Sequence, residues 1–581
     1  MGDRFDRIEG RLEHLEIVVD DPTRRLHSLQ EERRALGAMP RLAPAAPAGM
    51  GAAMAPAADV TRVLSLAGRT FVVFAGAYFL RALTESGTVS GPAGITLGLL
   101  YAAVWMVLAD RTGAADRLGG ELHGAAALTI ALPLLWEACT TRQLIPPVGG
   151  AVALVGVSIA GLFVAWRRKL HGLAWVATIG ALVAGVGLLF VTKAVAAYAV
   201  FFVVLGIATL WLGYDRGWYG LRWPAALVAD LAIVGLTSRA LTQGTGEPPA
   251  TAIAVQLLLL STYLTTIAAR TLVRRRSVIP FEVAQGAATL AVGLGGAMAV
   301  TASTGVGGQV LGLGALLLGA GSYVVAFAFV ARRRDPSVNF YFYTSVGLVL
   351  TLAGSQRILA PDVLVMTWGA VAWLAAWSGH RFERTTLAAH AAVFATAAAF
   401  MSGLVPVAAA ALLSSSADWT AFSWPALVTL FLVAACLLTR APASAESRPA
   451  RRIPRLVIAV LLTIAIAGLA ASVLAAAVAD SPADRHDALP TVRTAVIAAL
   501  AIAVAFVGRY PRWVEFGWLV YPLLIAGTAK LLVDDLRHSP ASMLVIALGL
   551  YGGALIAAPR VSRPRTAARE RSRRSPSVLS G

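Results

Sequence analysis

The sequence is poor in charged residues, in lysine and in cysteine. Only 14% of its 581 residues are charged and 58% are hydrophobic, whereas about a quarter of the residues of a soluble domain are charged. None of the three lysines, Lys169, Lys193 and Lys530, lies in a G-x-x-x-x-G-K-[ST] context, which excludes the phosphate-binding loop of an ATP-driven pump. Both cysteines, Cys139 and Cys436, lie in apolar segments, and no C-x-x-C or H-E-x-x-H motif occurs. We therefore expect no disulfide framework, no zinc site and no cofactor.

What the chain has instead is a long series of apolar runs. A helix needs about 20 mainly apolar residues to cross the hydrocarbon core of a bilayer. Eighteen such runs lie between residues 63 and 558, and they begin near 63, 91, 124, 146, 172, 194, 223, 250, 280, 309, 338, 361, 387, 421, 456, 490, 514 and 541. The sequence therefore predicts an all-α, polytopic transmembrane helix bundle of about 18 spans, with membrane lipids as its partners.

Positive charge is distributed in short clusters between alternate runs. The net charge of +18 would suggest nucleic-acid binding in a soluble protein, but clusters in alternate turns are typical of cytoplasmic loops. Of the 49 basic residues, 39 lie in these turns, in residues 1–62 or in the tail 559–581. The pattern predicts an even number of spans in a bacterial inner membrane, with both termini cytoplasmic and no nucleic-acid partner.

Three segments lie outside this predicted membrane domain, which spans residues 63–558. Apolar residues recur every three or four positions between Phe5 and Leu36, which predicts two short coiled-coil-like helices within residues 1–36. We expect residues 3–36 to mediate self-association or to bind a protein partner. Residues 37–62 are interpreted as an Ala/Pro-rich linker. The basic tail, 559–581, is predicted to be disordered and to lie near anionic headgroups.

Three stretches carry a resemblance to a known family. Gly68–Leu80 reads GRTFVVFAGAYFL, Thr140–Val155 reads TTRQLIPPVGGAVALV, and Gly527–Leu536 reads GTAKLLVDDL. Together with the N-terminal coiled coil and linker, they resemble a bacterial family of multi-pass membrane proteins that carry a domain of unknown function. The fifth run, ALVAGVGLLF, departs from the Gly-Pro-containing end that relatives tend to show. The resemblance implies an integral membrane protein and leaves its activity open.

Ionisable residues inside apolar runs are costly, so each is a candidate functional residue. Asp230 lies about seven residues into the seventh run and is the deepest acid. It is either a hydrogen-bonded structural carboxyl group or part of a proton or cation relay. Lys530 and Asp534 are four residues apart, so one helical face carries both. They are interpreted either as an interfacial ion pair or as a pair that contacts substrate or gates a pathway.

Glu137 and Arg239 map to the ends of their runs, on the side opposite the basic clusters. Long side chains at such positions can extend to the interface. If Glu137, Arg239, Lys530 and Asp534 converged, they would line an outward-facing polar pocket.

The sequence leaves three functions open. The first is a non-enzymatic envelope scaffold or assembly protein that acts through residues 3–36. The second is a secondary transporter or a lipid or saccharide flippase that uses the intramembrane charges. The third is a membrane-embedded enzyme acting on lipid-linked substrates, and it is the least favoured because the turns opposite the basic clusters are too short for a catalytic domain. No catalytic or metal-binding residue is predicted.

Overall fold

The computed structural model describes residues 68, 72–73, 75–242, 248–330, 338–413, 421–440, 452–478, 482–536 and 541–562, and these contain helices and no strand. The chain divides into two units, Met1–Phe79 and Leu80–Gly581. In the first unit, residues 75–79 are helical. The predicted coiled coil of residues 1–36, the linker 37–62 and most of the tail 559–581 lie outside the described residues.

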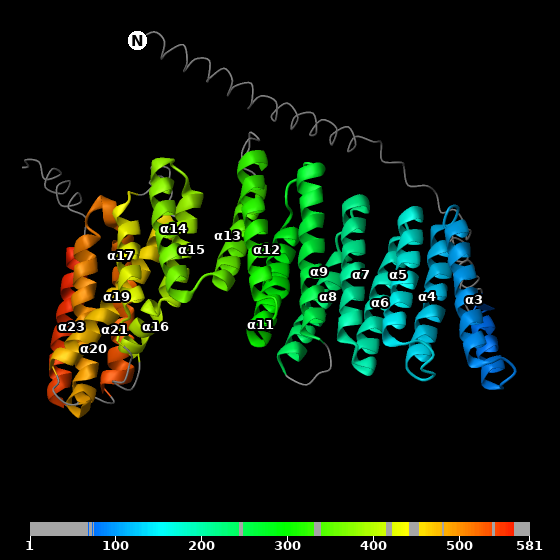
Figure 1. The fold of residues 1–581 in the computed structure, drawn as a ribbon, viewed down its shortest axis with the longest axis horizontal. Coiled ribbons are helices and arrows are strands. Elements are labelled where there is room, and N and C mark those ends of the chain that lie inside the picture. The colour runs from blue at the N-terminus through cyan, green and yellow to red at the C-terminus, as the bar shows by residue number, and fades with distance from the viewer. Residues whose placement is uncertain are drawn as a thin grey trace, which may run out of the picture. The chain divides into compact units, whose positions relative to one another are not determined.

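Antiparallel helices make up the second unit (Figure 1). Its first part consists of α3 (Gly91–Thr112), α4 (Arg117–Cys139), α5 (Pro147–Arg168), α6 (His171–Thr192), α7 (Val195–Arg216), α8 (Arg222–Leu241), α9 (Pro249–Ala268), η1 (Ala269–Val273), α10 (Pro280–Ala288), η2 (Thr289–Leu294) and α11 (Gly295–Thr304). Its second part consists of α12 (Gly308–Val324), η3 (Val325–Val330), α13 (Val338–Ile358), α14 (Pro361–Arg381), α15 (Thr385–Met401), α16 (Leu404–Leu413), α17 (Trp424–Leu438), α19 (Ile453–Val478), α20 (Pro482–Val507), η5 (Pro511–Trp513), α21 (Val514–Lys530), η6 (Leu531–Asp535) and α23 (Ala541–Val561). Segments η1, η2, η3 and η6 are π-helical.

Proline and left-handed residues set the ends of these helices. Pro147 and Pro249 each stand at the first position of a helix, where the missing N–H costs nothing. Lys169 and Lys193 end α5 and α6 in the left-handed conformation. Gly403, with a φ of +79°, lies at the 65° bend between α15 and α16. The apolar runs are thereby cut into lengths that suit a bilayer.

The lengths and apolar character of the helices identify a multi-pass membrane protein. Among the described residues, 13 helices are long and apolar enough to cross a membrane, or 14 if the bent pair α15–α16 is one span. Many of their large hydrophobic side chains are exposed, such as Val310 at 78% and Phe190 at 73%. Such exposure is favourable in lipid. The expected count of 18 spans remains a prediction.

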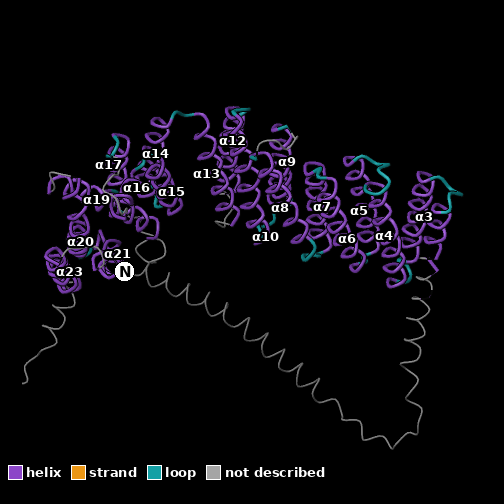
Figure 2. The backbone as a smooth tube through the Cα atoms, turned by 90° about the horizontal axis from the view of Figure 1, so that it is seen from below, coloured by secondary structure: helices purple, strands orange, loops and turns teal. Residues whose placement is uncertain are grey.

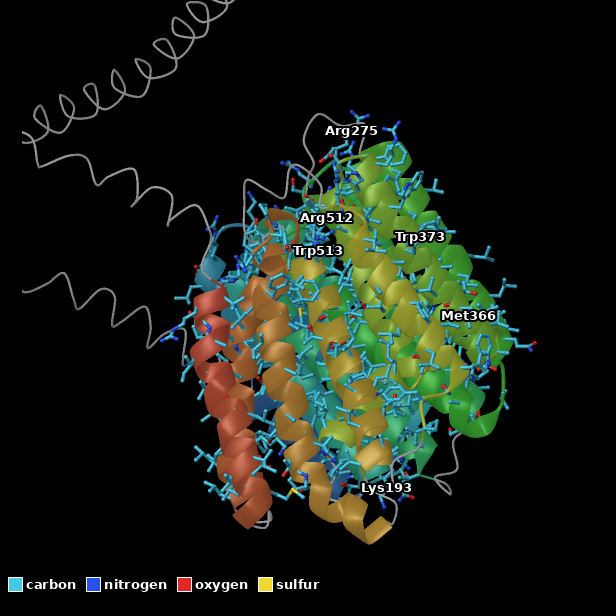
Figure 3. The ribbon with its side chains drawn as sticks, turned by 90° about the vertical axis from the view of Figure 1, so that its left-hand side faces the viewer. Lys193, Arg275, Met366, Trp373, Arg512 and Trp513 are labelled. Atoms are coloured by element: carbon cyan, nitrogen blue, oxygen red, sulfur yellow. The ribbon has the colours of Figure 1, made fainter. Side chains whose placement is uncertain are left out.

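Successive helices pack as neighbours around several apolar cores. The largest core lies among α3 to α10, another among α9 to α13, and another from α13 to α23. Figure 2 shows the same neighbours from below, with loops confined to the helix ends. Because consecutive helices reverse direction, alternate turns lie at the same end. Figure 3 shows Arg275 and Arg512 at one end, which we call the basic end, and Lys193 at the other, which we call the neutral end.

Glycines allow a close helix crossing between α12 and α13. A β-carbon at Gly312 would lie 3.0 Å from the carbonyl oxygen of Gly354, and one at Gly354 would lie 2.7 Å from that of Gly312. Backbones this close are typical of small-residue contacts in membranes. By contrast, β-carbons at Gly549 and Gly553 would meet no atom within 4 Å. Gly312 forms a G-x-x-x-G pair with Gly308, and Gly549 forms one with Gly553. Both members of the first pair face α13, whereas β-carbons at the second pair would have open surroundings.

We predict that Gly354→Leu destabilises the protein while Gly549→Leu has little effect. The new side chain at position 354 must displace the α12 backbone, and overpacking of this kind costs about 1–3 kcal/mol. Thermal unfolding of the two variants in the same detergent measures the difference. Equal melting temperatures for both variants and the wild type would contradict the packing described here.

Candidate functional site: a buried polar seam

Polar residues recur on the buried face of α8. Arg222, Asp230 and Thr237 follow at intervals of eight and seven residues, which places them on one side of the helix. Arg222 and Asp230 are 7% and 9% exposed. At 1.5 Å per residue, Asp230 lies about 12 Å along the helix from Arg222 at the basic end. The face therefore carries polar groups from the basic end towards the neutral end.

The helix α9 presents a matching series to the same interior. Gln256, Tyr263 and Arg270 are seven residues apart along α9 and η1, so they also share one face. Gln256 and Tyr263 are fully buried. A third series lies on α10 and η2, where Glu282, Gln285 and Thr289 are buried. We call the polar groups of these three series, together with Tyr214 of α7, the polar seam.

At the basic end, the seam is closed by a buried carboxylate. Glu282, which is fully buried, accepts hydrogen bonds from Nη1 of Arg270 at 2.9 and 2.8 Å and from the hydroxyl of Tyr214. The backbone N–H of Ile279 also donates to it, over 2.9 Å. Arg222 stacks nearby, with its guanidinium 4.6 Å from the centre of the Phe281 ring. Two arginines, Arg222 and Arg270, surround one carboxylate, so the side chains at this end of the seam carry a net positive charge.

In the middle of the seam lies Asp230. Its Oδ1 accepts a hydrogen bond of 3.1 Å from Nε2 of Gln285, one helical turn beyond Glu282. The Tyr263 side chain interacts electrostatically with Asp230. Gly206 of α7 leaves room for the Tyr263 hydroxyl, since a β-carbon there would collide with it. A carboxylate and a phenol are thus both buried in this part of the protein interior.

Towards the neutral end, the seam continues through an amide and a hydroxyl group. Nε2 of Gln256 donates to Oγ1 of Thr237 over 2.6 Å. A β-carbon at Gly296 would lie 2.7 Å from this Nε2 and 2.9 Å from this Oγ1, so a larger residue here would displace one of the two side chains. Gly296 follows the π-helical segment η2, Thr289–Leu294. Single-turn π segments occur often at functional sites.

Two oxygen atoms of the seam have no hydrogen-bond partner among the described residues. They are the hydroxyl of Tyr263 and Oε1 of Gln256, and both are buried. An unsatisfied buried polar atom costs about 1–3 kcal/mol, and protein interiors satisfy such atoms with water or a ligand. The orphan oxygens therefore indicate that the seam receives water or an ion at Tyr263 and at Gln256.

The other residues singled out from the sequence lie elsewhere. Nε of Arg142 pairs with Oε1 of Glu137 at 2.9 Å, and both side chains are partly exposed. Nη1 of Arg239 donates to the backbone carbonyl of Lys193 over 2.9 Å. These contacts tie helix ends together at the neutral end. Arg142 was not recognised as the partner of Glu137, because the turn between α4 and α5 brings it back to the helix.

Lys530 lies in a second buried polar cluster, between α20 and α21. Its Nζ donates to the carbonyl of Pro490 at 3.0 Å and to Oγ1 of Thr494 at 3.1 Å, and it pairs with Asp535. Asp535 is fully buried and also accepts a hydrogen bond from Thr494. The π-helix η6 places residues five apart on one face, which explains the Lys530–Asp535 pair. The side chain of Asp534 lies outside the described part of the chain, so the predicted Lys530–Asp534 pair remains a prediction.

No described contact joins Glu137, Arg239 and Lys530 into one pocket. Glu137 and Arg239 belong to helices of the first core, whereas Lys530 contacts α20. A further buried carboxylate, Glu515, lies at the basic end of α21 and pairs with Arg452 and Arg455, each at 3.3 Å. Every charged group in these clusters is held by a fixed partner, as in a structural anchor. Oε2 of Glu515 also has no hydrogen-bond partner among the described residues. The seam around Asp230 differs because its carboxylate has an amide as donor and forms no ion pair with a described residue.

The chain matches no protein-family model, no curated protein and no solved structure. The resemblance to a bacterial family of multi-pass membrane proteins remains a prediction.

We predict that Glu282→Gln destabilises the protein far more than Glu85→Gln. Glu282 is fully buried, and removing its charge leaves Arg270, only 15% exposed, without a counter-ion. Breaking a buried ion pair costs about 3–5 kcal/mol. Glu85 forms an exposed pair with Arg81, which contributes little. Thermal unfolding in detergent separates the two, and similar melting temperatures would show that the Glu282 cluster does not hold α9 to α10.

Proposed function

We propose that the protein is a secondary transporter that carries protons across the membrane, and that Asp230 is the site that binds and releases the proton. The observation that carries this proposal is the series of buried polar groups along α8, α9 and α10, in which Asp230 has an amide donor and no described ion pair. The Tyr263 hydroxyl and Oε1 of Gln256 in the same series have no described partner. An intramembrane acid that faces the bundle interior is typical of proton relays. The seam is our basis for preferring transport to the other two functions left open by the sequence.

The chemistry of the seam suits a proton better than a metal cation. Asp230 can be charged or neutral, and in its charged form it accepts the hydrogen bond from Gln285. The Tyr263 hydroxyl can both accept and donate a hydrogen bond, as can that of Thr237. A metal ion of the hard class requires about six oxygen ligands, and Asp230 is the only carboxylate among the described residues in the middle of the seam. Protons can therefore pass between water, Asp230 and the hydroxyl groups.

The two ends of the seam support a directional pathway. Arg222 and Arg270 make the basic end positive, which opposes the entry of cations there unless Glu282 balances the charge. At the neutral end, Thr237 lies two residues from Arg239, which is partly exposed. A proton on Asp230 is thus separated from both ends by other polar groups of the seam. Transporters use such a central site between two alternating gates.

The scaffold function rests on residues 3–36, which lie outside the described residues, and it remains a prediction. Deleting residues 1–36 distinguishes the two ideas. Transport through the seam should continue without this segment, whereas a scaffold that recruits partners through it should fail.

We predict that Asp230→Asn abolishes proton flux. The full chain is reconstituted into liposomes that contain a pH-sensitive dye, and a potassium diffusion potential drives protons inward. Asparagine cannot exchange a proton, so the rate should fall by about a hundredfold, the scale of a lost acid–base group. Asp230→Glu should retain a measurable part of the flux.

The matched control is Asp215→Asn. Asp215 is an exposed carboxylate at the end of α7 that accepts a hydrogen bond from Trp166 over 2.7 Å, and it lies outside the seam. This variant should carry protons like the wild type. Wild-type liposomes that match empty liposomes, or an Asp230→Asn variant with unchanged flux, would overturn the proposal.

A further inference from the structure

A large apolar groove lies on the side of α9 that faces away from the seam. It has a volume of about 940 Å³ and is bounded by α9, α11, α12 and Leu350 of α13. Its walls include Ile253, Leu257, Leu264, Val310 and Leu318. The groove runs along α9 from Ala250 to Thr265, which is about 22 Å at 1.5 Å per residue. This length exceeds half of the roughly 30 Å hydrocarbon core.

The groove is open to the lipid. Val310 and Leu318, on its rim, are 78% and 57% exposed. Both belong to α12, which together with the start of η3 is long and apolar enough to span the membrane. Water has no hydrogen-bond partners along such walls, apart from a few hydroxyl groups such as that of Ser261. An acyl chain is the component of the surroundings that matches the walls in both chemistry and direction.

A positive charge lies near the neutral end of the groove. Gly307 lines the groove, and a β-carbon on the adjacent Gly308 would lie 2.7 Å from Nη2 of Arg357. Arg357 forms no ion pair with a described carboxylate, and its buried Nε has no hydrogen-bond partner among the described residues. Arginine in this state is well suited to bind a phosphate group.

We infer that the groove binds one phospholipid of the leaflet at the neutral end. One acyl chain lies between α9 and α12, and the headgroup phosphate pairs with Arg357. The charge of Arg357 and the apolar walls are complementary to the two parts of such a lipid. This site is separate from the polar seam and does not depend on the proposed transport.

Two glycines of α12 allow a test that leaves the helix contacts intact. Gly314 lines the groove, and a β-carbon there would meet no atom within 4 Å. Gly321, two turns further along α12, has equally open surroundings but does not line the groove. Gly314→Leu therefore fills the groove, and Gly321→Leu adds the same side chain to a lipid-exposed position outside it.

The experiment uses the full chain in nanodiscs of phosphatidylcholine that contain a small fraction of phosphatidylglycerol with a photoreactive acyl chain. After irradiation, mass spectrometry of peptides measures crosslinking to α9 and α12. We expect Gly314→Leu to reduce crosslinking within the groove by about tenfold, which corresponds to the loss of contact with about two methylene groups. Gly321→Leu should crosslink like the wild type.

Headgroup recognition is tested with Arg357→Gln and a second probe. The variant should crosslink less to the phosphatidylglycerol probe, while crosslinking to a photoreactive diacylglycerol, which has no phosphate, should not change. Crosslinking to groove peptides no stronger than to other lipid-exposed helices, or unaffected by Gly314→Leu, would overturn the site. An equal effect of Arg357→Gln on both probes would overturn the assignment of the phosphate.

Discussion

A polar group within the hydrocarbon core must find its partner inside the protein, and this constraint governs where the charged residues of this chain lie. Burial of an unpaired charge is too costly to persist. The carboxylates Asp535 and Glu515 accordingly pair with lysine or arginine from their own or a neighbouring helix. Their clusters anchor helix ends, and they leave the lipid-facing surfaces apolar.

In the polar seam, buried charged groups also have partners inside the protein, but these partners are of two kinds. Glu282 is neutralised at the basic end by Arg270, but Asp230 has only an amide, Gln285, as its described hydrogen-bond donor. An amide supports a carboxylate without a counter-charge, so Asp230 can gain and lose a proton without breaking an ion pair. The fixed clusters hold the helices together, whereas the seam keeps one carboxyl group able to change its charge.

The sequence was informative about the membrane architecture and about single charges in apolar runs, but less so about their partners. Asp230 stood out because an acid is rare in such a run. Gln256 and Tyr263 were not predicted as site residues, because neutral polar residues are common in membrane helices. Their seven-residue spacing with Arg270 nevertheless indicated that the three residues share one helical face. The Lys530–Asp535 pair could not be predicted, since it depends on a π-helix that changes the spacing of facing residues from four to five. Of the partners of Glu282, Tyr214 belongs to a helix distant in sequence, and only packing reveals it.

The central claim is that polar groups connect Asp230 to the neutral end through the protein interior. A cryo-EM map of the purified protein, at a resolution that shows ordered water, tests it most directly. The account predicts non-protein density within hydrogen-bond distance of the Tyr263 hydroxyl and of Oε1 of Gln256. A map in which both oxygens bond only to protein groups, with apolar side chains closing the space between them and Asp230, would contradict it.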